Sequence, residues 1–360
     1  DLQHLPNLEV DFGQSVFSAF TNGNFCVCIF FVLSGFVLSR KYFQSGSVHD
    51  LVSGAGRRFI RLYIPIAATI IIVYLTAKAG LFYNASAAKF VHSQWCYEGI
   101  FNIPDITYMM LQSLFCSALL NGNQVFNTVF WTMPIELYFS FFVYGFLLLT
   151  HYTSRRKLVI VLTAILCILS NNVFAVLFLS GISLNYISQP HGERNKFISV
   201  ITTLILLFVA LVLGSYPTND EIKGTLYEHL GHTLVEFHLW FHALGAYLLV
   251  LAFVLSPRLQ RLVSMRFFRF LGYISFSLYL LHVPVFCSLG SFVFLKVVGS
   301  LGYNYSVLVV FLISTGALFL LSWLMTKYID EPGTRLARYV YERFFGNTAA
   351  DDANAVGRDN

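Results

Sequence analysis

Charged side chains are scarce in this sequence, and their scarcity decides the class of protein. Only 11% of the 360 residues are Asp, Glu, Lys or Arg, whereas 57% are hydrophobic and the mean hydropathy is +0.68. A water-soluble domain needs a polar shell that this composition does not supply. The composition therefore excludes an ordinary soluble globular protein and predicts one that buries its apolar surface in a lipid bilayer.

Cysteine clusters and long basic runs are also lacking. The six cysteines, at positions 26, 28, 96, 116, 167 and 287, include no group with metal-ligand spacing, so no metal site is predicted from them. Cys96 and Cys116 alone fall on the predicted outer side, where they either form a disulfide or remain two thiols. The net charge of +5 comes from Lys and Arg between apolar runs, which indicates membrane topology and not nucleic-acid binding.

The apolar runs are continuous, which predicts helices, because the strands of a membrane barrel alternate apolar and polar residues. Residues 158–188 are too many for one span, and Asn171-Asn172 divides them into a hairpin of two. Residues 106–120 are too few to cross and predict a re-entrant or interfacial segment. The seven remaining spans are predicted at 25–38, 62–82, 128–150, 197–214, 232–255, 270–290 and 305–327. We expect an all-α polytopic transmembrane bundle of about nine spans.

The distribution of basic residues predicts the orientation. If the loop 39–61 and the C-terminal tail lie inside, 19 of the 23 Lys and Arg residues are cytoplasmic, as the positive-inside rule requires. The C-terminus is then cytoplasmic and the N-terminus is outside. Two glycosylation-type tripeptides, beginning at Asn84 and Asn304, both fall outside. We expect residues 1–345 to form the membrane domain and the polar residues 346–360 to form a disordered tail.

Titratable residues within spans are costly and indicate function. Glu136 lies in an apolar helix, where it either serves chemistry or pairs with a cation to fix packing. His282 is followed by Pro284, which frees a backbone carbonyl and is typical of a site facing the bundle interior. Both are candidate catalytic residues.

A second histidine-rich helix offers a metal site as the weaker of two interpretations. His238 and His242 are four residues apart and share a helix face, but Glu236 lies off that face. His229 and His232 precede them. A polar seam facing other helices fits this pattern better than a metal centre.

Two segments are candidates for ligand binding. Ser34 and Gly35 interrupt an apolar helix and permit either close helix packing or the approach of a ligand. Arg57, Arg58 and Arg61 form a basic edge that marks topology, contacts lipid headgroups or grips phosphates bidentately.

Five motifs, in this order, resemble the acyltransferase-3 family of integral membrane acyltransferases. They are FFVLSGF at 30–36, RRFIRLYIP at 57–65, WTMPIELYF at 131–139, LGYISFSLYLLHVP at 271–284 and YIDEP at 328–332. The resemblance covers about residues 25–335. It implies ten spans in the complete fold, so an additional first helix is expected ahead of Asp1, carrying an Arg and the His thought to act in acyl transfer.

The resemblance implies a membrane-bound O-acyltransferase with no permanently bound cofactor. Acyl-CoA, acetyl-CoA in the simplest case, would be the co-substrate, and the acceptor would be a hydroxyl of a glycan, a lipid or a secreted metabolite. Arg57, Arg58 and Arg61 would hold the phosphates, and Ser34 and Gly35 would belong to the acyl-CoA site. The His of the additional first helix would deprotonate the acceptor hydroxyl or carry the acyl group, with Glu136 orienting or charging it. His282 is the second candidate for this acid-base chemistry. The alternatives are a proton-coupled transporter, in which Glu136 and His282 relay the proton, and an inactive scaffold.

Overall fold

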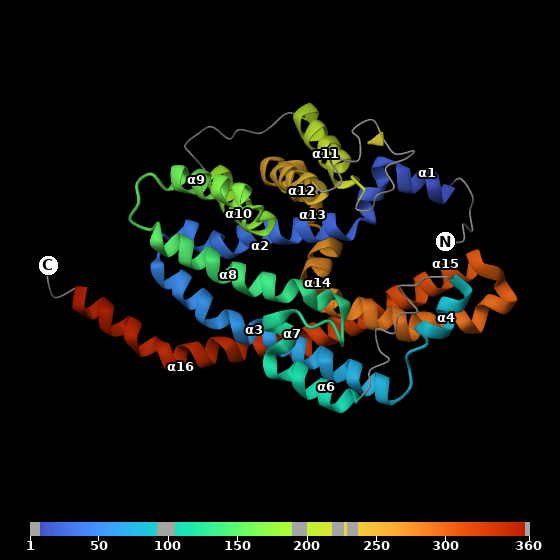
Figure 1. Ribbon diagram of the computed structural model, residues 1–360. Coiled ribbons are helices and arrows are strands. Elements are labelled where there is room, and N and C mark those ends of the chain that lie inside the picture. Colours follow the sequence, from blue (N-terminus) through green and yellow to red (C-terminus); the bar gives the residue numbers. More distant parts are fainter. Residues whose placement is uncertain (1–7, 92–104, 189–199, 218–226, 229–236, 357–360) are drawn as a thin grey trace. The chain divides into compact units, whose positions relative to one another are not determined.

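The structure is a computed structural model that describes residues 8–91, 105–188, 200–217, 227–228 and 237–356. Every regular element within those residues is a helix (Figure 1). The chain divides into two compact units. One comprises residues 1–4, 56–137 and 269–360, and the other comprises residues 5–55 and 138–268. We call them the arginine unit and the glycine unit after the residues discussed below. Their boundaries fall inside helices α3, α8 and α14.

The glycine unit is built around two helices, α2 (Gly23–Ser45) and α10 (Val173–Ser188), which pack against each other. Helix α12 (His238–Leu255) contacts both of them, α11 (Val200–Gly214) packs on α12, and α9 (Arg156–Leu169) packs on α10. Asn22 caps α2, with its side-chain oxygen accepting from the Phe25 N–H at 3.1 Å. The chain leaves α2 through Gly46, whose φ of 69° suits a residue without a side chain.

The arginine unit contains most of α3 (Val48–Lys78), the first residues of α8 (Thr132–Leu149) and nearly all of α14 (Arg266–Val285). Between α3 and α8 it also holds α4 (Asn84–Val91), α6 (Ile106–Gln112), α7 (Ala118–Asn121) and the 3-10 turn Thr128–Trp131. After α14 it holds α15 (Ser291–Met325) and α16 (Glu331–Val356). Helix α15 bends at Gly302, where φ is 69°. Within the described part of this unit, π-helical turns occur at Ser113–Ser117, Phe286–Gly290 and Thr326–Asp330.

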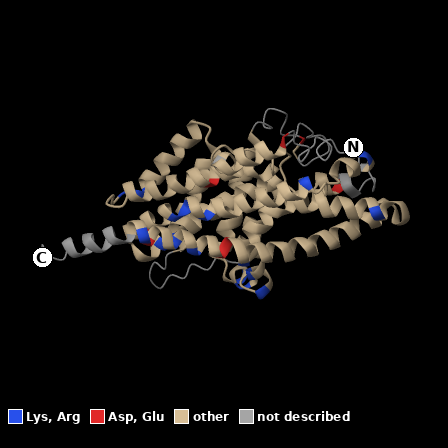
Figure 2. Cartoon of the chain, turned by 90° about the horizontal axis from the view of Figure 1, so that it is seen from below, with Lys and Arg blue, Asp and Glu red and all other residues tan. Residues whose placement is uncertain are grey.

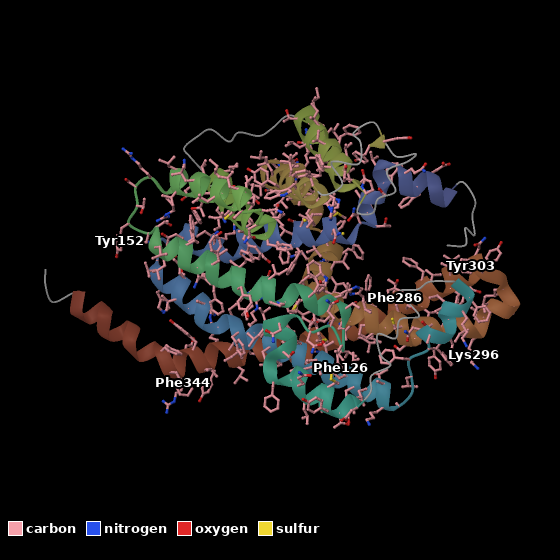
Figure 3. All side chains as sticks on the ribbon, viewed as in Figure 1. Phe126, Tyr152, Phe286, Lys296, Tyr303 and Phe344 are labelled. Atoms are coloured by element: carbon pink, nitrogen blue, oxygen red, sulfur yellow. The ribbon has the colours of Figure 1, made fainter. Side chains whose placement is uncertain are left out.

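Apolar side chains from α3, α7, α8 and α14 form the core of the arginine unit. Ile66, Phe126, Met133 and Leu280 are each at most 1% exposed within it. Figure 3 shows Phe126 among the helices, whereas Tyr152 and Phe344 point away from the ribbon. These inward residues fix the positions of the polar groups described below.

Large apolar side chains also cover much of the outer surface. Leu149, Leu169 and Ile201 are 86%, 78% and 71% exposed to solvent. Acidic and basic residues are few along the ribbon (Figure 2). A monomer in water does not leave this much apolar surface uncovered, but a lipid-facing surface requires it.

Among the described residues, five helical stretches are long and apolar enough to cross a membrane. They are Gly23–Ser45, Val48–Lys78, Thr128–Leu149, His238–Leu255 and the bent run Arg266–Phe345, which contains two of the predicted spans. Val173–Ser188 and Val200–Gly214 are shorter apolar helices, as is Ile106–Phe115 in the predicted re-entrant segment. The all-α polytopic fold is confirmed, and about nine remains the predicted number of spans.

The predicted hairpin within 158–188 is confirmed. Helix α9 ends at Leu169 and α10 begins at Val173. Asn171 takes a left-handed φ of 54°, and the Asn172 side chain caps α10 by accepting from the Ala175 N–H at 3.1 Å. Asparagine favours both roles, so the turn follows from this residue pair.

The prediction of a loop over residues 39–61 was wrong. Helix α2 continues to Ser45 and α3 begins at Val48, so Arg57, Arg58 and Arg61 lie within a 31-residue helix. Hydropathy places a span boundary at the first charges, but a helix continues through them when a buried partner is available. Helix α16 begins at Glu331 and extends to Val356, and the disorder of residues 346–360 stays a prediction.

Candidate functional site

A buried ion pair joins α3 to α8 within the arginine unit. The Arg58 guanidinium donates through Nη2 to Oε1 of Glu136, and the two residues are only 7% and 3% exposed. Burying either charge alone costs several kcal/mol, so the two ionised groups stabilise each other in apolar surroundings. The packing interpretation of Glu136, a carboxylate paired with a cation on a neighbouring helix, therefore matches its immediate surroundings.

One helical turn before Glu136, a second polar contact joins α8 to α14. The Thr132 hydroxyl lies 2.9 Å from the Tyr279 hydroxyl and also donates to the Val129 carbonyl at 2.9 Å. Residues four apart share a helix face, so Thr132 and Glu136 lie on the same side of α8. A further bond, from Thr326 to the Ser277 hydroxyl at 2.8 Å, ties α14 to the turn that follows α15.

His282 lies one turn after Tyr279 on α14 and is held in one tautomer. Its Nδ1 is 2.7 Å from the Tyr279 carbonyl oxygen, which accepts hydrogen bonds but does not donate them. Nδ1 therefore carries the proton, and in the neutral ring Nε2 carries the lone pair. The side chain is half-buried. The ring also interacts with a second backbone carbonyl, that of Leu278. A neutral imidazole is a candidate general base.

The remaining arginines lie on the same helix as Arg58. Arg57 is half-buried, Arg61 is exposed, and the charge of Arg61 interacts with that of Asp330 at the end of the π-helical turn after α15. The neighbouring Glu331 accepts a hydrogen bond from the Tyr273 hydroxyl at 3.0 Å. The motif at 328–332 thus interacts with the motif at 57–65 and with the motif at 271–284 within one unit.

Ser34 and Gly35 belong to the glycine unit, where close packing explains the glycine. A Cβ at Gly35 would lie 2.2 Å from the Phe178 carbonyl oxygen, and one at Gly181 would lie 2.2 Å from the Val32 carbonyl oxygen. Helices α2 and α10 approach closely because neither residue has a side chain. The role of Ser34 and Gly35 in acyl-CoA binding remains a prediction.

The histidines of α12 also lie in the glycine unit. The Nε2 of the fully buried His242 is 2.9 Å from the Tyr216 carbonyl oxygen, and the Asn22 amide is 3.2 Å from the same nitrogen. These contacts with protein groups match the predicted polar seam. Glu236, His229, His232 and Cys96 lie outside the described residues.

The arginine unit thus contains the predicted residues Arg58, Glu136 and His282, and two residues not selected from the sequence, Thr132 and Tyr279, join α8 to α14. Thr132 was missed because a lone threonine in an apolar helix carries little signal, although its spacing from Glu136 could have been noticed. Tyr279 belongs to the motif at 271–284, but nothing in the sequence indicates that it contacts α8.

The apolar outer surface defines an integral membrane protein. Its interior holds an ion pair, paired hydroxyl groups and an imidazole that can take part in chemistry. The chain belongs to the acyltransferase-3 family, whose acyltransferase domain matches residues 3–327. It is 22% identical to acyltransferase clz18 of Cochliobolus lunatus over an alignment of 382 residues, which covers 88% of this chain and 80% of that protein. No solved structure matches the chain.

Proposed function

We propose that this membrane acyltransferase moves an acyl group, acetyl in the simplest case, from acyl-CoA to a hydroxyl of a glycan, a lipid or a secreted metabolite. The observation that supports this most directly is the fixed tautomer of His282, with Nδ1 bonded to the Tyr279 carbonyl and Nε2 left as the base. A half-buried neutral imidazole can remove a hydroxyl proton without first losing a proton of its own.

In the proposed reaction, Nε2 of His282 takes the proton of the acceptor hydroxyl as its oxygen attacks the thioester carbonyl. The tetrahedral intermediate collapses, the carbon–sulfur bond breaks, and the CoA sulfur leaves with the proton returned by the imidazolium. The products are an ester and free CoA, and the histidine is restored. The Tyr279 carbonyl keeps the ring oriented throughout this exchange.

Glu136 acts in this scheme through its partner. The carboxylate is bonded to Arg58, which supports the assignment of Glu136 as a positioning residue that keeps a guanidinium fixed within apolar surroundings. Arg57 and Arg61, on the same helix and less buried than Arg58, are better placed for the phosphates of the donor. The proposed orientation, with a cytoplasmic C-terminus, puts these arginines toward the cytoplasmic pool of acyl-CoA.

Transfer from radiolabelled acetyl-CoA by the full-length chain in proteoliposomes tests the function. We expect label in a hydroxyl ester, with free CoA released in equal amount. A proton-coupled transporter would instead move solute across the vesicle membrane without any acyl donor. Solute movement of that kind, with no ester formed from any acyl-CoA, would refute the proposal.

A further inference from the structure

A backbone carbonyl next to the candidate base lacks its usual helical partner. Pro284 lies within α14 and has no N–H, so it donates nothing to the Leu280 carbonyl four residues earlier. Leu280 is fully buried, which keeps water from the carbonyl oxygen. A buried acceptor in this position needs a donor from elsewhere in the fold.

Asn127 provides that donor. Its Nδ2 donates to the Leu280 carbonyl oxygen at 2.6 Å, and its side chain is fully buried. The other end of the same amide accepts from the Val129 N–H at 3.3 Å and caps the 3-10 turn Thr128–Trp131, which leads directly into α8. One side chain therefore bonds both the start of α8 and the proline-interrupted part of α14.

These two bonds hold the helices that carry the candidate site. Leu280 lies two residues before His282, and Asn127 lies five residues before Thr132, whose hydroxyl contacts Tyr279. The carbonyl of Tyr279 in turn fixes the tautomer of His282. A change in the position of the Leu280 backbone therefore moves the imidazole relative to α8.

We propose that Asn127 is a positioning residue for acyl transfer: it replaces the N–H that Pro284 lacks and so sets the orientation of His282. This inference rests on the proposed function, because its kinetic consequence requires that His282 act as the base. Asn127 does not contact the reacting atoms in this proposal. Its effect is exerted through the backbone of α14.

The test compares Asn127→Ser in two backgrounds. Serine keeps a capping oxygen for the turn before α8 but is too short to reach Leu280. In the wild-type background we expect kcat to fall about tenfold with an unchanged KM for acetyl-CoA, because misplaced catalytic groups slow chemistry without weakening donor binding. In a Pro284→Ala background, the new N–H bonds the Leu280 carbonyl, so the same change should lower kcat less than about threefold.

Pro65→Ala supplies the matched control background. Pro65 also interrupts a helix of the arginine unit, but the carbonyl that it frees belongs to Arg61 and not to α14. Asn127→Ser should therefore lower kcat by the full tenfold in the Pro65→Ala background. An equal loss in the Pro284→Ala and Pro65→Ala backgrounds would overturn the inference, as would a normal kcat for Asn127→Ser alone.

Thermal unfolding of the same variants separates this inference from the proposed function. If the wild-type protein transfers no acyl group, the function fails, but Asn127→Ser should still lower the unfolding temperature more in the wild-type background than in the Pro284→Ala background. Equal shifts in both backgrounds would show that Asn127 does not compensate for the proline.

Discussion

Arg58 on α3 and Glu136 on α8 form an ion pair with both side chains buried in the same unit. Arg58 lies ten residues after the start of α3 and Glu136 four residues after the start of α8, so the pair joins the first half of α3 to the N-terminal part of α8. Burying either charge without the other is costly in free energy, so the pairing holds α3 and α8 together at this point.

Breaking this pair from one side should destabilise the protein more than removing it altogether. Arg58→Met or Glu136→Leu alone strands a buried charge and should cost about 3–5 kcal/mol of the free energy of unfolding. The double variant should recover most of that loss, while transfer activity stays low in all three proteins. Unfolding in detergent measures the energies, and losses that simply add would contradict a direct pairing.

Arg57 and Arg61 should affect the binding of acyl-CoA through the phosphates of its nucleotide. Arg57→Ala and Arg61→Ala are each expected to raise the KM for acetyl-CoA by at least about tenfold, because a charge-assisted bond to phosphate is worth about 1.5–3 kcal/mol. The KM for a small acetyl thioester without the nucleotide should not change. Arg338→Ala, at an exposed position on α16, is the control. Equal effects on both donors would rule out phosphate binding.

A substitution at Gly35 distinguishes between helix packing and ligand binding as the role of this residue. Gly35→Ala places a Cβ 2.2 Å from the Phe178 carbonyl oxygen and should cost about 1–3 kcal/mol of stability. Gly145→Ala, where a Cβ meets nothing within 4 Å, should be neutral or slightly stabilising. If Gly35→Ala instead left the unfolding temperature unchanged and raised the KM for acetyl-CoA, the sequence-based assignment to donor binding would be favoured over packing.

Chemical modification should distinguish His282 from His242, because their burial differs. Diethyl pyrocarbonate acylates an imidazole nitrogen that carries an accessible lone pair. We expect peptide mass spectrometry to find His282 modified and protected by CoA, with His242 unmodified because it is fully buried. Modification of His282 at the same rate with and without CoA would place it away from the donor.

The sequence predicts the membrane helices well because the signal that defines them, a long apolar run, is local. The hairpin at Asn171-Asn172 is an example, since the same two residues supply the left-handed turn and the helix cap. The start of α3 was not predicted, because it depends on a contact between residues that are far apart in the sequence. Whether Arg58 ends a span or continues it depends on Glu136, which is 78 residues away in the sequence.

The candidate site also has residues that the local sequence reveals and residues that only contacts between helices reveal. Glu136 and His282 are predictable because a titratable side chain in an apolar run is conspicuous on its own. Their partners Thr132, Tyr279 and Asn127 are ordinary residues whose importance comes from contacts between helices. Pro284 indicates that a carbonyl needs a donor, but only the fold shows that Asn127 provides it.

The most direct test of the catalytic proposal is the single-turnover rate of acyl transfer by His282→Gln, measured with saturating acetyl-CoA in the full-length protein. Loss of a general base should lower this rate about 100-fold or more, while the dissociation constant for CoA stays at the wild-type value. Transfer at the wild-type rate by this variant would contradict the assignment of His282 as the base.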